Sequence, residues 1–180
     1  TTYKKITLTY NPYEWLEASF FYTNIQGLPY PGFEFQDYKD KGFNVKLRLK
    51  EQDIFPAVAV GIMDIAGTGY YSSEYVVTSY AINNIDMHYG FGWGTLNGST
   101  DQFKNPLGYI NDGFNVRPSD TENINSLGGE FDTSRYFSGE KISSFYGASI
   151  SLNTKILLKI EKDTTLTTGL IEYEKPKSDY

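Results

Sequence analysis

The chain has no cysteine and one histidine among its 180 residues. The lack of cysteine excludes disulfide bonds, thiolate metal sites and cysteine nucleophiles. His88 would have to serve any Ser-His-Asp triad, and no serine stands in a nucleophile-elbow motif. A metal would find only oxygen ligands beside that histidine, and the loop NDG at 111–113 lacks the acidic spacing of a calcium loop. We therefore expect no enzymatic activity, no catalytic residues, no metal and no cofactor.

The sequence also lacks any run of eighteen apolar residues, which excludes a transmembrane helix. A membrane protein is not excluded, because a strand of a transmembrane barrel needs only about ten residues with one apolar face. The formal net charge of −6 argues against nucleic acid as a partner. Aromatic residues, in contrast, are abundant at 17%, and they suit both β-strands and membrane interfaces.

Apolar and polar residues alternate with a period of two along most of the chain, which predicts β-strands. The clearest case is 42–50, where Phe43, Val45 and Leu47 alternate with polar or basic side chains. We expect residues 1–180 to form a single all-β segment with a long loop at 95–143. The strands are expected near residues 3–10, 15–24, 42–50, 57–65, 74–81, 85–94, 144–152 and 155–162.

The connections between these strands alternate in length. Those at 25–41, 66–73 and 95–143 are long, whereas those at 11–14, 51–56, 82–84 and 153–154 are short. In an antiparallel up-and-down sheet, successive connections lie at opposite ends, so all the short turns fall at one end. Outer-membrane barrels have short periplasmic turns and longer extracellular loops. The pattern predicts an antiparallel up-and-down transmembrane β-barrel, or about the first eight strands of a larger one.

Aromatic positions give a second test of this orientation. Tyr10 falls on the predicted outward face at the periplasmic end, and Tyr22, Phe43 and Trp93 fall on outward faces at the extracellular end. These are the positions of the aromatic girdles of a membrane barrel. The alternative is a soluble β-sandwich that buries the same apolar faces in its core.

The stretch HYGFGWG at 88–94 places an aromatic residue at every second position. If the aromatic side chains face lipid, the lumen side carries His88, Gly90, Gly92 and Gly94. Glycine within a strand marks either curvature of the wall or the close approach of another segment. The second possibility would allow the loop 95–143 to fold inward along the glycine strip.

Basic residues are also expected on the lumen side. They are Lys46, Arg48, Lys50, Lys155 and Lys159. A basic stripe in a narrow pore favours anionic sugars, because low-dielectric walls focus the field. Salt bridges across the wall are the alternative use of these charges.

Four segments occur in a characteristic order: YNPYEWLEASFFYT at 10–23, QDYKDKGFNVKLRLKE at 36–51, FPAVAVGIMDIAGTGYYSSEYVVTS at 55–79 and DMHYGFGWGTLNG at 86–98. They resemble the YjbH/GfcD family, which are outer-membrane barrel lipoproteins of exopolysaccharide and capsule biosynthesis. The resemblance spans roughly residues 8–135. It implies the outer membrane of a Gram-negative bacterium, with lipid, exopolysaccharide and other secretion-operon proteins as partners. Because the family's chains are several times longer, it also implies an N-proximal piece that ends at the start of a further strand.

The sequence thus leads us to expect a non-catalytic conduit or scaffold in exopolysaccharide or capsule export. A soluble β-sandwich that binds carbohydrate through its loops is one alternative, and it would shield the alternating apolar faces with protein. A purely structural barrel without glycan traffic is the other. Deleting the gene and measuring the secreted polymer would distinguish a purely structural barrel from one that takes part in export.

Overall fold

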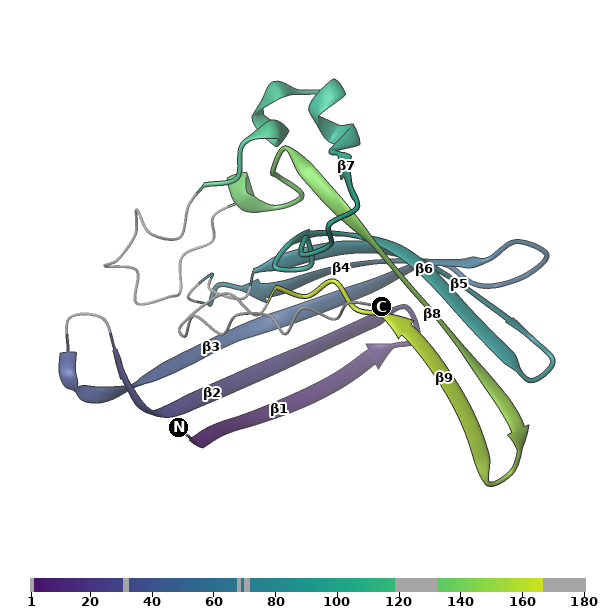
Figure 1. The fold of residues 1–180 in the computed structure, drawn as a ribbon, viewed down its shortest axis with the longest axis horizontal. Helices are drawn as coiled ribbons and strands as arrows, with labels where there is room; N and C mark the ends of the chain where they lie inside the picture. Colours follow the sequence, from purple (N-terminus) through teal and green to yellow (C-terminus); the bar gives the residue numbers. More distant parts are fainter. Residues whose placement is uncertain (1, 31–32, 68, 70–71, 119–132, 167–180) are drawn as a thin grey trace.

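The computed structural model is one antiparallel β-sheet, and it describes residues 2–30, 33–67, 69, 72–118 and 133–166 (Figure 1). The strands are β1 (Thr2–Tyr13), β2 (Leu16–Tyr30), β3 (Phe33–Lys50), β4 (Ala57–Ile65), β5 (Ser73–Ile82), β6 (Ile85–Gly94), β7 (Gln102–Lys104), β8 (Lys141–Asn153) and β9 (Ile156–Lys162). The 3₁₀ helices η1 (Pro106–Tyr109), η2 (Asp112–Asn115) and η4 (Thr133–Arg135) lie between β7 and β8. No helix in these described ranges is long and apolar enough to cross a bilayer. The prediction of an all-β antiparallel fold is confirmed.

Strands β1 to β6 pair in the order in which they follow one another, and β8 then pairs with β6. Short β7 and longer β9 both pair with β8 along its other edge. Within the described part of the chain, no pairing joins β1 to β9, so the sheet is open (Figure 1). It is also strongly twisted, and β8 and β9 run obliquely across the direction of β1–β3 (Figure 1).

The two faces of the sheet differ in chemistry and in exposure. On one face, Leu8, Phe20 and Phe43 lie opposite one another across β1–β3, and Phe43 is 50% exposed. On the other face, Phe21 is 4% exposed and its ring lies over Gly42. We call these the outer face and the inner face. Large exposed residues of the outer face are Ile6, Leu8, Tyr10, Phe20, Phe43, Met87, Tyr89, Leu158 and Ile160.

The inner face of β2 and β3 buries polar groups beside apolar ones such as Phe21. Thr23 and Asp40 are paired across β2 and β3 and are nearly inaccessible, with Lys5 completing the row on β1. In a soluble sheet that packs on a core, the face turned to water is polar, whereas the outer face of β1–β3 is apolar and exposed. The pairing also separates the faces of β4, placing Val60 outward beside Leu47 and Gly61 inward beside Lys46. The sequence alone left the two faces of this strand indistinguishable.

The connection predicted at 25–41 is strand over nearly all its length. β2 continues to Tyr30 and β3 begins at Phe33. The glycine and proline content favoured a loop, but the ladder accommodates Gly27 and Pro29 through a register shift between Ile25 and Pro29. Gly27 has a φ of 80°, which glycine adopts without strain. The expected long loop at this position is therefore wrong, and a β-hairpin extension takes its place.

Candidate functional site

The inner face of β3 carries two of the predicted basic residues. Lys46 lies opposite Glu17 of β2, and Arg48 lies opposite Ala59 of β4. The Arg48 guanidinium forms ion pairs with Glu51 at 2.7 Å and with Glu14 at 3.8 Å. Because all these side chains are partly or largely exposed, the pairs add little stability, and the guanidinium keeps donors for a ligand.

Lys50, the last residue of β3, is held by contacts with the turn that follows the strand. Its Nζ donates a hydrogen bond to Asp53 Oδ1 at 2.7 Å and lies 5.1 Å from the ring centre of Phe55. The backbone N–H of Phe55 donates to the same oxygen at 2.7 Å. The hydrogen bond from Lys50, followed by the one from Phe55, holds the pKa of Asp53 below its usual value. The charge of Lys50 therefore stabilises the turn after β3.

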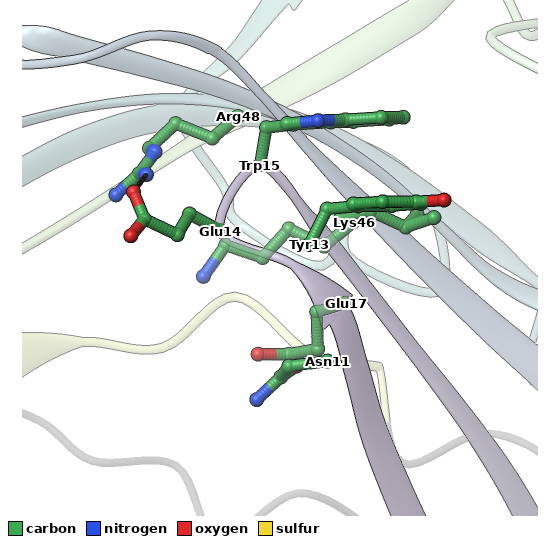
Figure 2. A pocket seen from close by; sticks show the side chains of 8 residues that line it. Asn11, Tyr13, Glu14, Trp15, Glu17, Lys46 and Arg48 are labelled. Atoms are coloured by element: carbon green, nitrogen blue, oxygen red, sulfur yellow. Dashed lines mark ion pairs between the residues drawn. The ribbon is translucent and has the colours of Figure 1, made fainter.

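A pocket of about 360 Å³ opens beside Arg48 at this end of the sheet (Figure 2). Its lining residues come from β1, β2, β3 and the turn between β1 and β2. They are Asn11, Tyr13, Glu14, Trp15, Leu16, Glu17, Lys46 and Arg48. The rings of Tyr13 and Trp15 stack in parallel, with centroids 5.3 Å apart and planes inclined by 2°. Figure 2 shows Glu14 and Arg48 on one side of this ring pair.

The short turn explains how the two rings come together. Tyr13 ends β1 and pairs with Leu16 at the start of β2, which leaves Glu14 and Trp15 as the turn residues. The carbonyl oxygen of Trp15 accepts a hydrogen bond from the backbone N–H of Arg48 at 2.8 Å. This bond fixes the turn against β3. The aromatic pair stays more than half exposed while its backbone is held.

This pocket combines an exposed aromatic platform with charged and amide groups. The face of an aromatic ring stacks on the C–H surface of a pyranose, and Asn11 and Glu17 offer partners for hydroxyl groups. Arg48 and Lys46 add cationic donors that suit carboxylate or phosphate substituents. The described residues contain no cluster of His, Asp or Glu side chains that could hold a metal ion. The pocket is suited to binding a polar, partly acidic saccharide.

The glycine strip of β6 is covered by neighbouring side chains. A Cβ atom on Gly90 would collide with the Phe145 ring of β8 and lie 2.8 Å from the carbonyl oxygen of Val76. A Cβ atom on Gly92 would collide with Leu96, which follows β6 directly. Leu96, two residues beyond the end of β6, thus lies over Gly92, whereas a side chain of the neighbouring strand covers Gly90. Thr164 Oγ1 donates to the carbonyl oxygen of Leu96 at 2.7 Å and fixes this cover.

Gly94 has a different role from the other two glycines. It ends β6 with a φ of 62°, and a Cβ atom there would collide with the carbonyl oxygen of Ser72. The position therefore requires glycine for its backbone conformation and for its close contact.

His88 lies on the same face as the glycine strip. Its ring covers Gly147 of β8, and it lines a second pocket of about 200 Å³ with Phe145 and Glu161. Lys159 is opposite Ser149 on β8, on the same inner side. Lys155 differs from its prediction, because it lies in the turn before β9 rather than on a strand. Its backbone N–H donates to the side chain of Asn153 at 2.8 Å.

Three of the predicted girdle residues lie on the outer face. Tyr10 and Phe43 are exposed, and Tyr22 pairs with Ile6. Trp93 differs, since it is 4% exposed and packs edge-on against Phe137 with centroids 5.2 Å apart. The connection between β7 and β8 folds over this end of the sheet and covers the indole. Trp93 is therefore not at an exposed girdle position.

Sequence reasoning missed the ion pair that attaches this connection. Glu74, at the start of β5, is completely buried and accepts hydrogen bonds from Arg117 at 2.8 and 3.0 Å. Arg117 also donates to Ser72 Oγ at 2.6 Å, and the backbone N–H of Phe137 donates to Glu74 at 3.0 Å. No spacing links a strand glutamate to a loop arginine, so no pattern in the sequence indicated this contact.

Asn105 organises the same connection from within. It is completely buried, and its Nδ2 lies 3.0, 3.0 and 2.9 Å from the carbonyl oxygens of Phe114, Phe137 and Gly139. Its Oδ1 accepts a hydrogen bond from the backbone N–H of Leu107 at 3.1 Å. Because an amide has two N–H donors, the three carbonyls share them. This single side chain joins segments from both ends of the connection.

Comparison with known proteins gives a consistent family. The YjbH family model, described as "Exopolysaccharide biosynthesis protein YbjH", matches residues 1–166. The chain is 37% identical over 142 residues to the "Uncharacterized lipoprotein YjbH" of Escherichia coli (strain K12). That alignment covers 76% of this chain and 20% of the relative, so the chain spans about a fifth of the relative's length. No solved structure matches the chain. The chain belongs to the YjbH family of exopolysaccharide biosynthesis proteins.

Proposed function

We propose that this chain is part of an outer-membrane β-barrel that serves exopolysaccharide or capsule export as a non-catalytic conduit or scaffold. The observation that carries the proposal is the polarity of the sheet, with exposed apolar residues such as Leu8 and Phe43 outside and buried Thr23 and Asp40 inside. Exposed apolar area costs about 25 cal/mol per Å² in water, whereas lipid removes that cost. The link to exopolysaccharide comes from the family description. The relative's name, which describes a lipoprotein, supports attachment to a membrane.

Strand lengths support a membrane location. β4, β5 and β6 have 9, 10 and 10 residues. A tilted barrel strand needs about 9–11 residues to cross the hydrocarbon layer. The 15 residues of β2 and 18 of β3 exceed that length, so their hairpin would extend beyond the bilayer at the loop end. Such an extension would present residues 25–30 and 33–38 to the outside of the cell.

The open sheet edges lead to the second part of the proposal. β1 and β9 each have an edge that pairs with no strand in the described ranges. Unpaired backbone groups are not tolerated in hydrocarbon, which requires a closed barrel. We assign the missing strands to the remainder of a longer protein, since the chain spans about a fifth of its relative.

The inner face would be the surface that contacts glycan. Lys46 and Arg48 on β3 and Lys159 on β9 place cationic groups there, with Glu17 and Glu161 as acidic neighbours, and His88 adds a polar group on β6. A low-dielectric wall strengthens the attraction of such charges for acidic sugars. The role would be passive binding and guidance, without bond chemistry. The pocket beside Tyr13 and Trp15 would contact the polymer at the turn end.

A gene deletion in the source bacterium tests this function. The deletion strain should secrete less polysaccharide, measured as hexose and uronic acid in the medium, and the full-length gene should restore it. Fractionation of the complemented strain should recover the protein with outer membranes. Recovery as a soluble protein would instead support the carbohydrate-binding β-sandwich. Unchanged polymer secretion with the protein in the outer membrane would support a purely structural barrel.

A further inference from the structure

Three lysines lie together on the outer face, near the start of β1. Lys4 is opposite Asn24 of β2, which is opposite Lys39 of β3. Lys41 lies one row closer to the centre of the sheet, opposite Tyr22. All three lysines are exposed. We refer to Lys4, Lys39 and Lys41 as the lysine rim.

The lysine rim borders directly on the apolar part of the outer face. The next row toward the centre is Leu8, Phe20 and Phe43, with the Phe20 and Phe43 rings 5.5 Å apart. A step of two residues along a strand is about 7 Å, so charge gives way to hydrocarbon over that distance. Tyr22 shares the row of Lys41, between the row of Lys39 and the row of Phe43. Aromatic and then cationic side chains beyond an apolar band are typical of the headgroup level of a membrane.

The three ammonium groups have no acidic partner in the described part of the chain, where the ion pairs involve other residues. The carboxylate nearest in sequence on this face is Asp37, and its Oδ1 accepts a hydrogen bond from the backbone N–H of Gly27 at 3.0 Å. Lys5, the neighbour of Lys4, points to the other face and lies 5.1 Å from the Phe21 ring centre. The positive charge of the lysine rim is therefore available to a ligand.

We propose that the lysine rim binds the phosphate groups of anionic lipid headgroups, an inference that rests on the membrane location proposed above. Adjacent strands are about 4.8 Å apart, so the backbones of Lys4 and Lys39 are about 10 Å apart across β2. Long lysine side chains cover that span, and two or three of them reach one phosphate or two adjacent ones. The acyl chains of the same lipid would lie along the row of Leu8, Phe20 and Phe43. This match of charge and apolar surface favours a phospholipid over a free anion.

Lipid binding by the full-length protein in neutral detergent tests the inference. The probe is phosphatidylglycerol in mixed micelles, with phosphatidylcholine as the zwitterionic reference, and native mass spectrometry counts the retained lipids. We expect phosphatidylglycerol to be retained in preference. A lysine near a membrane surface contributes about 1 kcal/mol, so K4Q should weaken binding about fivefold and K39Q/K41Q about thirtyfold. The matched control K104Q/K141Q removes two exposed lysines of the β7–β8 pair and should leave binding unchanged.

Two competitors identify the source of the phosphate and the class of ligand. Inorganic phosphate at equal concentration should not displace phosphatidylglycerol, because it lacks acyl chains. Polygalacturonate tests an acidic glycan at the same surface. If polygalacturonate binds with an affinity that falls in K39Q/K41Q, the lysine rim is a glycan site and the lipid assignment is wrong. Equal retention of the two phospholipids, or equal losses in the control, would also overturn it.

A second measurement distinguishes failure of the lysine rim inference from failure of the proposed function. A spin label at position 47 of the same protein in vesicles reports whether the outer face meets lipid. If that label is accessible to oxygen and K39Q/K41Q binds phosphatidylglycerol normally, only the lysine rim inference fails. If the label is shielded by protein, the membrane location fails and this inference fails with it.

Discussion

Glu74 and Arg117 form a bidentate ion pair in which both oxygens of a completely buried carboxylate accept guanidinium N–H groups, at 2.8 and 3.0 Å. The pair joins β5 to the connection between β7 and β8. Removing one partner leaves the other charge buried without compensation, which costs about 3–5 kcal/mol.

We therefore predict that Arg117→Ala detaches this connection from the end of the sheet. Limited proteolysis of the full-length protein should then cleave within residues 105–118 or 133–139, where the wild type resists. Arg117→Lys should be intermediate, because an ammonium group lacks the planar fork. Lys141→Ala, an exposed lysine of β8, is the control and should resist like the wild type. Equal protease resistance of Arg117→Ala would show that the pair does not hold the connection.

A second prediction concerns the close contact of His88 with Gly147. A Cβ atom at position 147 would lie 2.5 Å from His88 Cε1 and 2.7 Å from Nε2. Gly147→Ala should therefore destabilise the protein by about 1–3 kcal/mol, as overpacking does. Adding His88→Ala should restore most of that loss, since the blocking atoms belong to a side chain.

Urea unfolding in detergent measures both variants, and Gly94→Ala serves as the contrasting case. There the obstacle is the backbone carbonyl of Ser72 together with a φ of 62°, so no side-chain truncation should rescue it. Strictly additive losses for His88→Ala and Gly147→Ala would mean that the contact does not determine the cost.

The pocket of Figure 2 gives a third prediction. Trp15→Ala removes one ring of the stacked pair and should weaken binding of oligosaccharides from the secreted polymer by about three- to tenfold. Isothermal titration calorimetry of the full-length protein measures this. Arg48→Gln should weaken only acidic oligosaccharides, and its effect should shrink at high salt. Ile54→Ala, an exposed residue of another turn, is the control, and an equal loss there would exclude the pocket as the site.

A fourth prediction concerns pH. The hydrogen bonds from Lys50 and Phe55 lower the pKa of Asp53 in the folded protein below the reference value of 3.8. The contribution of this contact to folding is thus present above pH 3.8 and is lost as the pH falls through the lowered pKa. Carboxyl ¹³C NMR, assigned with Asp53→Asn, should give a midpoint below 3.8, and Lys50→Gln should raise it. A midpoint at or above 3.8 in the wild type would contradict the turn geometry.

Local alternation was enough to predict every strand except short β7 and to separate the two faces of β3, but not those of β4. Phe43, Val45 and Leu47 lie on the outer face because a strand sends alternate side chains to opposite sides. The extension of the β2–β3 hairpin through residues 25–41 was not predictable, because Gly27 and Pro29 ordinarily end a strand. Only pairing with a partner strand shows that the ladder continues past them.

Contacts between distant segments were beyond the sequence pattern. Trp93 was expected on an exposed surface, since a period of two cannot show that Phe137 would cover it. Tyr13 was expected in the short turn at 11–14 and Trp15 at the start of the next strand. Their stacking depends on the turn geometry and on the hydrogen bond between Trp15 and Arg48. The basic stripe was visible in β3, whereas the pairing of Lys50 with Asp53 required the structure.

The central claim is that the outer face meets lipid and the inner face meets water. Single cysteines at each position from 43 to 50 of the full-length protein in lipid vesicles, carrying spin labels, test it directly. Oxygen accessibility should peak at positions 43, 45, 47 and 49, and a polar relaxation agent should favour positions 44, 46, 48 and 50. If the apolar positions were closed to both reagents, the outer face would be buried in protein and the membrane barrel would be wrong.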